Sequence, residues 1–497
     1  MAISAVGSNN PLIRQIGSMR SQMDDILAQL STGKVSSTYG GLGVKRSVDI
    51  AFRQQLSEVE AFKSSTELVG LRISSVSTAI DRFSVIADDM QAVLNPNGGE
   101  AGDDGRTFDQ SQARSALEEI IGLFNADVGG RYGFSGTSVT TKPVVDLDLM
   151  LDGDATHAGL RQLTDERRQA DLGADGLGRL VLAPVDTATN TVTLSEDTGG
   201  IPFGFKLSDA SGTLTNGTVS GPTGDPPSVS IALTGQPNAG ETVKLELTLP
   251  DGSTETITLT AEAAPGSGAA GTFAIGADPT ETAENLRTAL GDAVGKSAET
   301  SLAAASGLQA AREFFAVEGA SPMRVDGPPF DTATGLVAGT ETNTVSWYVG
   351  DNDYSTDARD SVAARVDAGV TASYGVRANE EAFGNMMATL GALFVADGTA
   401  KAEHGELAER AYQALGFPKD KQTLQDIQIE LAAANSAVEQ AEERHIVTQN
   451  SLLTSIEEIE RTDDNELAVY LLSLQNRLTA TYQATAIMYQ MSLTQYL

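Results

Sequence analysis

Near the N-terminus, apolar residues recur with gaps that alternate between four and three. The positions are Leu12, Ile16, Met19, Met23, Ile26 and Leu30. This heptad spacing places all of them on one face of a helix, which is typical of helices that pack as coiled coils. A second series with the same spacing runs from Phe52 to Leu94 and includes Val59, Phe62, Val69, Ile73, Val76, Ile80 and Phe83. It predicts one continuous helix, about 65 Å long, that ends at the breaker Asn95–Gly99.

The C-terminal part repeats this pattern. One apolar series runs from Leu424 to Ile459 and includes Leu431, Val438 and Leu452. Side-chain oxygens at Thr462–Glu466 then predict a new helix start. The last helix carries two neighbouring stripes, the first with Leu467, Leu471, Leu474, Leu478 and Met488, and the second with Tyr482, Tyr489, Leu493 and Tyr496. Polar residues within these series, such as Thr66 and His445, are expected to pack at the helix interface and to fix its register.

The middle of the chain differs in pattern. Residues 141–345 hold 28 acidic and 11 basic side chains, half of the chain's negative charge excess. Val243–Leu249 alternates as a half-buried strand, Pro250–Gly252 makes a turn, and Thr254–Thr260 returns as a second strand. Further strands are expected at Thr189–Leu194, Phe203–Leu207 and Ser228–Leu233, followed by a helix that begins with Asp278 as cap and Pro279 in its first turn.

Since the matching apolar series lie at opposite ends of the chain, we expect the two ends to pack together. The predicted class is α+β: a long α-helical coiled-coil rod made by the N- and C-terminal segments, with a β-rich mixed outer domain inserted between them. The expected parts are a terminal inner helix and loop (1–47), N-terminal rod helices (48–140), the acidic insert (141–345), a mixed return segment (346–420), a C-terminal rod helix (421–461) and a terminal inner helix (462–497).

The composition argues against catalysis. The chain has no Cys and three His, which removes thiolate chemistry and leaves little imidazole for acid–base work. We therefore expect no enzyme, no catalytic residue, no cofactor and no metal. Three motifs are interpreted as coincidental: Gly266–Gly271 precedes a predicted strand rather than a helix, Gly291–Ser297 is one residue short of a phosphate loop, and the Asp351–Asp357 series lacks the Gly and Glu of a calcium loop.

Charge restricts the partners. With 33 basic and 67 acidic residues the formal net charge is -34, which disfavours binding to nucleic acid or to anionic membranes. No apolar run is long enough to insert into a bilayer, and the N-terminus lacks the pattern of a cleavable signal. The partners should be proteins. The apolar faces of both terminal helices exceed what an intrachain pair can bury, so we expect copies of the chain to pack together, and head-to-tail packing that does not close generates a filament.

Several segments resemble the bacterial flagellin family. Residues 21–46 (SQMDDILAQLSTGKVSSTYGGLGVKR) are similar to its N-terminal helix and L-S-x-G-K signature. Residues 125–137 (NADVGGRYGFSGT), with the motif residues Gly130, Arg131, Tyr132, Phe134, Ser135, Gly136 and Thr137, resemble a hallmark shared especially with hook-filament junction proteins. The end of the chain, 462–497, also resembles that branch. The family's A-K-D-D-A-A-G segment is replaced by Ser37–Gly43.

The resemblance implies a structural subunit of the external bacterial flagellum that is exported without a cleaved signal through the flagellar type III apparatus, with an export chaperone. It implies assembly with itself and with neighbouring hook-junction and filament proteins, the terminal helices inside and the insert outside. A principal flagellin and a junction protein both remain open. The alternative is a secreted coiled-coil adhesin or type III tip-like protein that binds a protein ligand through its acidic insert.

Overall fold

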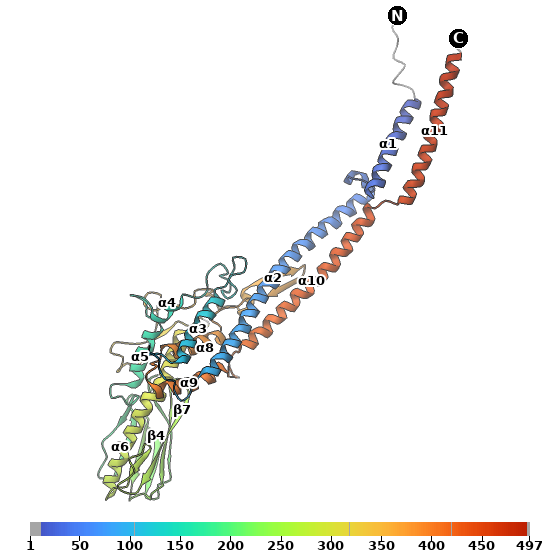
Figure 1. Cartoon of the computed structure of the whole chain (residues 1–497). Helices are drawn as coiled ribbons and strands as arrows, with labels where there is room; N and C mark the ends of the chain where they lie inside the picture. The colour runs from blue at the N-terminus through green and yellow to red at the C-terminus, as the bar shows by residue number, and fades with distance from the viewer. Residues whose placement is uncertain (1–10, 104, 318, 419, 495–497) are drawn as a thin grey trace. The chain divides into compact units, whose positions relative to one another are not determined.

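The computed structural model describes residues 11–103, 105–317, 319–418 and 420–494 (Figure 1). The chain is 51% helix and 16% strand, a mixture compatible with the α+β class. It divides into two compact units: the first comprises Met1–Val69, Arg365–Val370 and Ala437–Leu497, and the second Gly70–Ala364 and Thr371–Ser436. Among the described residues, no helix combines the length and apolar character needed to cross a membrane.

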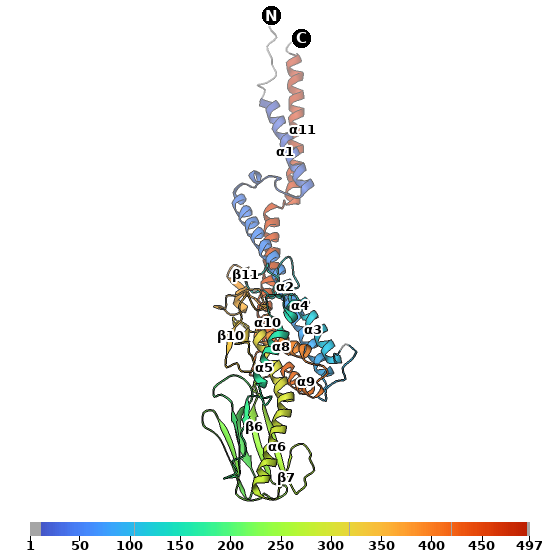
Figure 2. The same ribbon diagram turned by 90° about the vertical axis from the view of Figure 1, so that its left-hand side faces the viewer.

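The first unit contains α1 (Pro11–Thr32) and α11 (Asp464–Thr494), which lie side by side in two perpendicular views (Figures 1 and 2). Pro11 opens α1, as expected from its fixed φ. The start of α11 is capped by the Asp463 carboxylate, which accepts hydrogen bonds from the backbone of Asn465 (3.0 Å) and Glu466 (3.2 Å). The start of α11 agrees with the sequence prediction.

Two long helices contribute residues to both units. Helix α2 (Arg46–Val93) has 48 residues and α10 (Leu424–Glu460) has 37. The predicted continuous helix is therefore confirmed, and it ends before the Asn95–Gly99 breaker. Two contacts within the first unit show that α2 and α10 run antiparallel: Arg53 forms an ion pair with Glu460, and further along α2 the ring of Phe62 stacks on that of His445 with centroids 5.8 Å apart.

Two four-stranded sheets form the β-rich part of the second unit. One has the order β1-β2-β5-β4 and the other β3-β6-β7-β8. Their strands are β1 (Leu180–Leu182), β2 (Thr191–Glu196), β3 (Lys206–Gly212), β4 (Gly217–Thr223), β5 (Ser228–Leu233), β6 (Thr242–Thr248), β7 (Thr254–Glu262) and β8 (Thr272–Ala274). The predicted hairpin is β6–β7, which pairs Leu245 with Ile257 in antiparallel register. Asp278 caps α6 (Pro279–Ser297) by accepting a 2.9 Å hydrogen bond from Glu281 N–H, and α6 packs its Leu286 and Leu290 into the core of the sheets.

One expected strand is misplaced. Phe203–Leu207 was predicted to be extended, whereas β3 begins at Lys206. Phe203 lies instead in a separate cluster with Ala170, Ile201 and Val325. The alternation of apolar residues there serves two different cores, so its period does not mark one strand.

The other described elements lie outside these two sheets. They are α3 (Phe108–Phe124), α4 (Leu147–Asp152), α5 (Leu160–Leu172), a π-helical turn (Ala298–Leu302), α7 (Ala303–Phe314), α8 (Glu381–Val395), α9 (Lys401–Leu415), the 3-10 segments Tyr39–Lys45 and Arg359–Ser361, and the short strands β9 (Met323–Val325), β10 (Leu336–Ala338), β11 (Ala363–Asp367) and β12 (Val370–Ser373). Strands β9 and β10 pair with each other, as do β11 and β12. The 3-10 segment Tyr39–Lys45 lies in the stretch 1–47, where a terminal helix followed by a loop was expected. Helices α8 and α9 were not predicted, because α8 is apolar on all sides and shows no helical stripe.

Candidate functional site

The terminal helix pair has a small core. Met19, Ile26 and Leu474 are buried between α1 and α11, and partly buried side chains pack against them: Met23, Leu467, Leu471 and Leu478. These are the predicted stripe residues, brought together as expected. Ile16 is half-buried. The side chains of Leu12, Tyr489 and Leu493, and the whole of Tyr496, lie outside the described residues.

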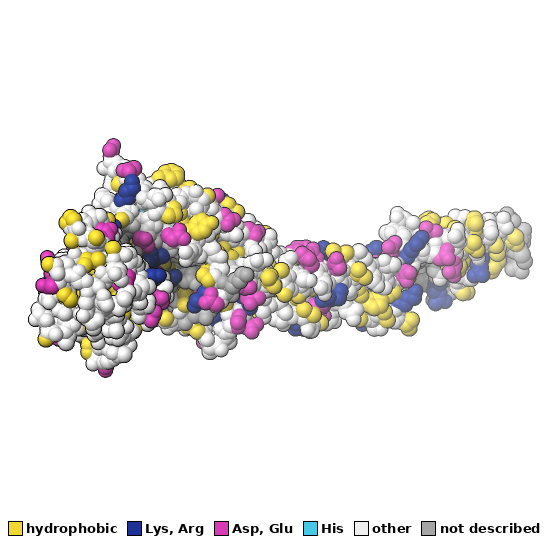
Figure 3. Space-filling model, turned by 90° about the horizontal axis from the view of Figure 1, so that it is seen from below, with side chains coloured by type: hydrophobic (Ala, Val, Ile, Leu, Met, Phe, Trp, Pro, Cys, Tyr) yellow, Lys and Arg dark blue, Asp and Glu magenta, His cyan; other side chains and the backbone are white. Residues whose placement is uncertain are grey.

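Much apolar surface of this pair faces solvent. Leu30, Tyr482 and Met488 from the predicted stripes are exposed, and so are apolar side chains outside them: Ile13, Leu27, Val469, Tyr470, Leu472 and Ile487. Val469 is 68% exposed and Leu472 60%. Hydrophobic side chains also reach the surface elsewhere along the helices, interspersed with charges (Figure 3). Exposed apolar residues clustered on one element mark interaction surfaces more often than isolated ones do.

Polar contacts join the turn after α1 to the end of α10. We call this group of contacts the clasp; it is formed by Gly33, Lys34, Val35, Arg53, Glu460 and Thr462. The carbonyl of Gly33 accepts a hydrogen bond from Thr462 N–H (3.1 Å), and that of Glu460 accepts one from Val35 N–H (2.7 Å). Lys34 Nζ lies 2.9 Å from the Glu460 carboxylate, which Arg53 also contacts. Burial opposes ionisation of Glu460, but the bonds from Lys34 and Arg53 outweigh it and hold its pKa below the usual value. The L-S-x-G-K segment thus joins the N- and C-terminal halves; Gly33 has φ +68, which favours glycine.

Two polar residues of the long helices meet one carbonyl. His445 Nε2 lies 2.7 Å from Val366 O, and the Thr66 hydroxyl donates to the same oxygen at 3.3 Å. Both side chains are buried. They therefore fix the strand β11 against α2 and α10 in the first unit. Two other polar residues spaced along the Leu424–Ile459 series are less covered, since Thr448 is exposed and Ser455 is half-buried, whereas the adjacent Ile456 is buried.

The other predicted interface residues of the long helices differ in burial. Val69, Ile73, Val76, Ile80, Phe83, Leu431, Val438 and Leu452 are buried, whereas Val59, Phe62 and Ile459 are half-buried. Burial is thus most complete away from the start of α2 and the end of α10. The residues nearest those ends retain surface that a further partner can cover.

The motif at Gly130–Thr137 is a tightly bonded loop in the second unit. Phe134 O accepts a hydrogen bond from Ala378 N–H (2.9 Å), and Gly136 N–H donates to Val376 O (3.0 Å). The Ser135 hydroxyl donates to Thr141 O at 2.6 Å. Each small or hydroxylated motif residue therefore has a defined place. Gly136 has φ +57, and an added Cβ there would lie 2.6 Å from Asp351 Cβ.

Phe134 joins this loop to the helices. Its ring packs with those of Phe83, Phe124 and Phe383 in one cluster, with centroid distances from 4.9 to 5.9 Å. All four side chains are at most 2% exposed. The rings meet mainly edge to face, a geometry that stabilises beyond area burial alone. The motif aromatic thus lies in the centre of the second unit's core.

A buried ion pair lies beside the motif. Arg377 is 1% exposed; its guanidinium is 3.1 Å from the Asp351 carboxylate and donates to the carbonyl oxygens of Asp353 and Thr356. Burial opposes ionisation of Asp351, but hydrogen bonds from Asp353, Thr137 and Arg377 outweigh it and lower its pKa. The Asp351–Asp357 series therefore surrounds an arginine in the way that a calcium loop surrounds a cation. Among the described residues, no group of three or more potential ligand side chains could hold a metal.

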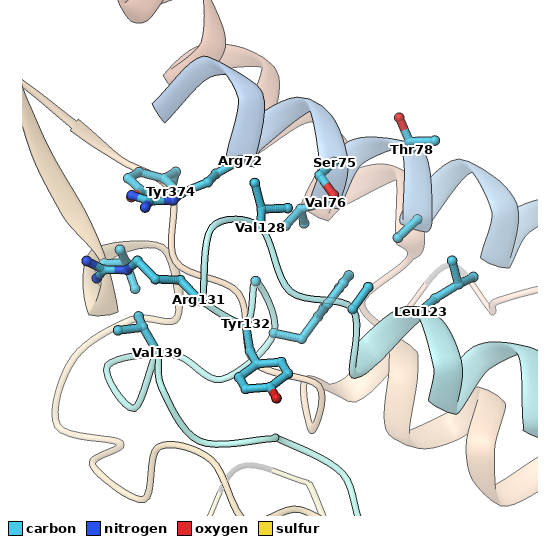
Figure 4. A pocket seen from close by; sticks show the side chains of 15 residues that line it. Arg72, Ser75, Val76, Thr78, Leu123, Val128, Arg131, Tyr132, Val139 and Tyr374 are labelled. Carbon is cyan, nitrogen blue, oxygen red and sulfur yellow. The ribbon is translucent and has the colours of Figure 1, made fainter. Parts of the chain in front are cut away.

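A cavity of about 260 Å³ opens between α2, α3 and the motif loop (Figure 4). Its walls are mainly apolar and include Val76, Leu123 and Val139. Arg72 and Arg131 reach toward one end of it, near Tyr374, away from Leu123 (Figure 4). The Nε of Arg72 is buried and has no hydrogen-bond partner among the residues that the structure describes. No pattern in the sequence indicates this cavity, because its walls come from four separate segments.

The two phosphate-loop look-alikes have ordinary structural roles. Gly266–Gly271 leads into the strand β8, as predicted, and Gly291–Ser297 forms the last turns of α6. Neither supplies a helix start with free amides. A comparison of the chain with models of known protein families and with curated proteins found no match to either.

Proposed function

We propose that the chain is a self-assembling structural subunit of the flagellin type, which builds a bacterial flagellar filament or the hook-filament junction. The observation that carries the proposal is the apolar surface of the α1–α11 pair. Leu474 is the only residue of α11 with a described side chain that is buried, although the helix is rich in Leu, Tyr and Met. Exposure of this kind is costly in water, and contact with other copies would remove it.

Three further features support the same proposal. The long helices α2 and α10 suit a coiled-coil rod. The clasp at Lys34 and the buried motif loop use the residues that resemble family signatures, so the resemblance falls on positions with structural roles. In the proposed polymer the terminal helices lie inside, the acidic β-rich part faces outward, and export proceeds without a cleaved signal through a type III apparatus and its chaperone.

The proposal is tested by removing the last helix. A chain lacking residues 467–497 should remain a soluble monomer with an unchanged second unit, whereas the full chain should form polymers when filament seeds are added. Sedimentation and electron microscopy measure both. Normal polymerisation of the truncated chain would refute the role of α11. Long tubes would favour a filament subunit and short terminal rings a junction protein.

A second test replaces two residues of α11 and keeps the full length of the chain. Val469→Asp with Leu472→Asp places charges on the exposed face of α11 and should block polymerisation without unfolding the monomer. Asn476→Asp, on the same helix, is the matched control because it adds a charge at an already polar exposed position. A secreted adhesin, the alternative function, would instead keep ligand binding in the full-length double variant and form no filament in any variant.

A further inference from the structure

The second unit carries an exposed aromatic residue at a position where nothing in the chain requires one. Phe108 is the first residue of α3 and is 65% exposed. Its backbone is fixed at this helix start by the capping box that Thr107 and Gln110 form. The neighbouring Asp103 is exposed as well, whereas the guanidinium of Arg106 is engaged over the ring of Phe394, 5.1 Å from its centroid. This end of α3 therefore presents an apolar projection beside a negative charge.

The other end of α3 borders the cavity described above. Leu123, near the end of the helix, is part of the cavity wall, and the cavity holds about 260 Å³. A benzene-sized molecule needs roughly 150 Å³, so a phenyl ring fits with space to spare. Neither Arg72 nor Arg131 forms an ion pair with a carboxylate among the described residues. The cavity is thus apolar with unpaired positive charge, which complements Phe108 and Asp103 in both shape and charge.

The two features cannot meet within one molecule. Fifteen residue steps of helix separate Phe108 from Leu123, a distance of about 22 Å. A rigid helix holds them apart, so Phe108 cannot fill the cavity of its own chain, whereas a second copy carries the matching Phe108 and Asp103. A contact that joins two different surfaces is heterologous, and it continues as a chain of subunits unless the rotation closes it into a ring.

We propose that Phe108 of one copy inserts into the cavity bounded by Arg72, Arg131 and Leu123 of the next, with Asp103 facing the two arginines. This contact rests on the proposed self-assembly and gives it direction, since one end of α3 donates and the other accepts. It is separate from the contacts of α1 and α11. Loss of either can therefore be measured on its own.

The first test is polymerisation of full-length variants. Phe108→Asp should raise the critical concentration for assembly roughly tenfold or more, since burial of a phenylalanine corresponds to at least that factor. Ile429→Asp, at another residue of the same unit that is 61% exposed, is the control and should assemble normally. Arg72→Glu should weaken assembly about two- to fivefold, and Asp103→Arg in the same chain should restore it. Normal assembly of Phe108→Asp would overturn the proposal and leave the role of α11 intact.

The second test does not require a polymer. Because the chain has no cysteine, single cysteines can be placed at Ser111, one turn beyond Phe108, and at Thr78, which lines the cavity. Mixing the two variants under mild oxidation should give a disulfide-linked heterodimer. Addition of Phe108→Asp to the Ser111→Cys chain should abolish the heterodimer, and Ile429→Cys in place of Thr78→Cys should give none. Absence of the heterodimer, or its persistence with Phe108→Asp, would refute the contact even if filaments form.

Discussion

Helices α8 and α11 are both rich in apolar residues but use them differently. In α8 every residue from Ala382 to Val395 except Asn385 is buried within its own chain. In α11 the exposed residues include Val469, Leu472 and Ile487. The comparison shows that apolar content alone does not identify a core helix. What matters is whether the same chain covers the helix, and in the proposed assembly other copies would cover the exposed residues of α11.

The largest loss of stability is expected from a substitution in the buried phenylalanine cluster of the second unit. Phe83→Ala removes the ring that contacts three other phenylalanines and should lower the free energy of unfolding by about 4 kcal/mol. Leu71→Ala on the same helix, at a side chain that is 58% exposed, should change it by less than about 0.5 kcal/mol. Denaturant unfolding measures both. Equal effects of the two substitutions would contradict the assignment of this cluster as the core.

The next effect concerns the buried ion pair. Arg377→Met leaves the Asp351 carboxylate without its cation and should cost about 3 kcal/mol. Because the pKa of Asp351 is lowered in the folded protein, its contribution is complete above the carboxyl's unfolded pKa of about 4 and is lost as the pH falls through the lower folded value. The difference in the free energy of unfolding between the wild type and the variant should therefore become smaller in acid.

Unfolding curves from pH 7 to pH 3 measure that gap. Arg287→Met, which removes a partly exposed partner of Glu284, is the control and should cost less than about 1 kcal/mol. A gap that stays constant with pH would show that Arg377 stabilises the fold by packing and not through Asp351.

A smaller loss of stability, limited to the helices α1 and α11, is expected from a substitution between them. Leu474→Ala should ease local opening of α1 and α11 by about 2 kcal/mol, seen as faster amide hydrogen exchange in these helices and unchanged exchange in α8. Val469→Ala should leave the exchange of the monomer unchanged but raise the critical concentration for assembly. If Val469→Ala destabilised the monomer, the exposed face of α11 would belong to its own chain's core.

The smallest effect is expected at the clasp. Lys34→Ala removes one exposed partner of Glu460 and should cost less than about 1 kcal/mol, because Arg53 and the backbone bonds at Gly33 remain. Gly33→Ala should cost more, since its φ of +68 is unfavourable for alanine. Exchange rates at the end of α10 distinguish the two. If Lys34→Ala destabilised the protein more than Gly33→Ala, the ion pair would contribute more to stability than the backbone conformation at Gly33.

Periodic patterns were enough to locate the long helices and the main hairpin. The alternation of four- and three-residue gaps requires α2 and α10, and the period of two at Val243–Leu249 requires a strand, because each pattern puts apolar groups on one side only in that conformation. The helix caps at Asp278 and Asp463 were also predictable, because each cap bonds only to residues next to it in the sequence. The strand at Phe203–Leu207 failed, since its apolar residues serve two cores.

The sequence by itself determined the long helices near both ends, the residues that form their apolar stripes, and that half of the charge excess lies in residues 141–345. Only the tertiary structure decided which stripe residues are covered. It also decided that Arg377 takes the place of a cation beside Asp351, that Lys34 reaches Glu460, and that Arg72 and Arg131 share a cavity. The physical reason is distance along the chain: periodicity records a residue's own helix or strand, whereas these contacts join segments that only folding brings together.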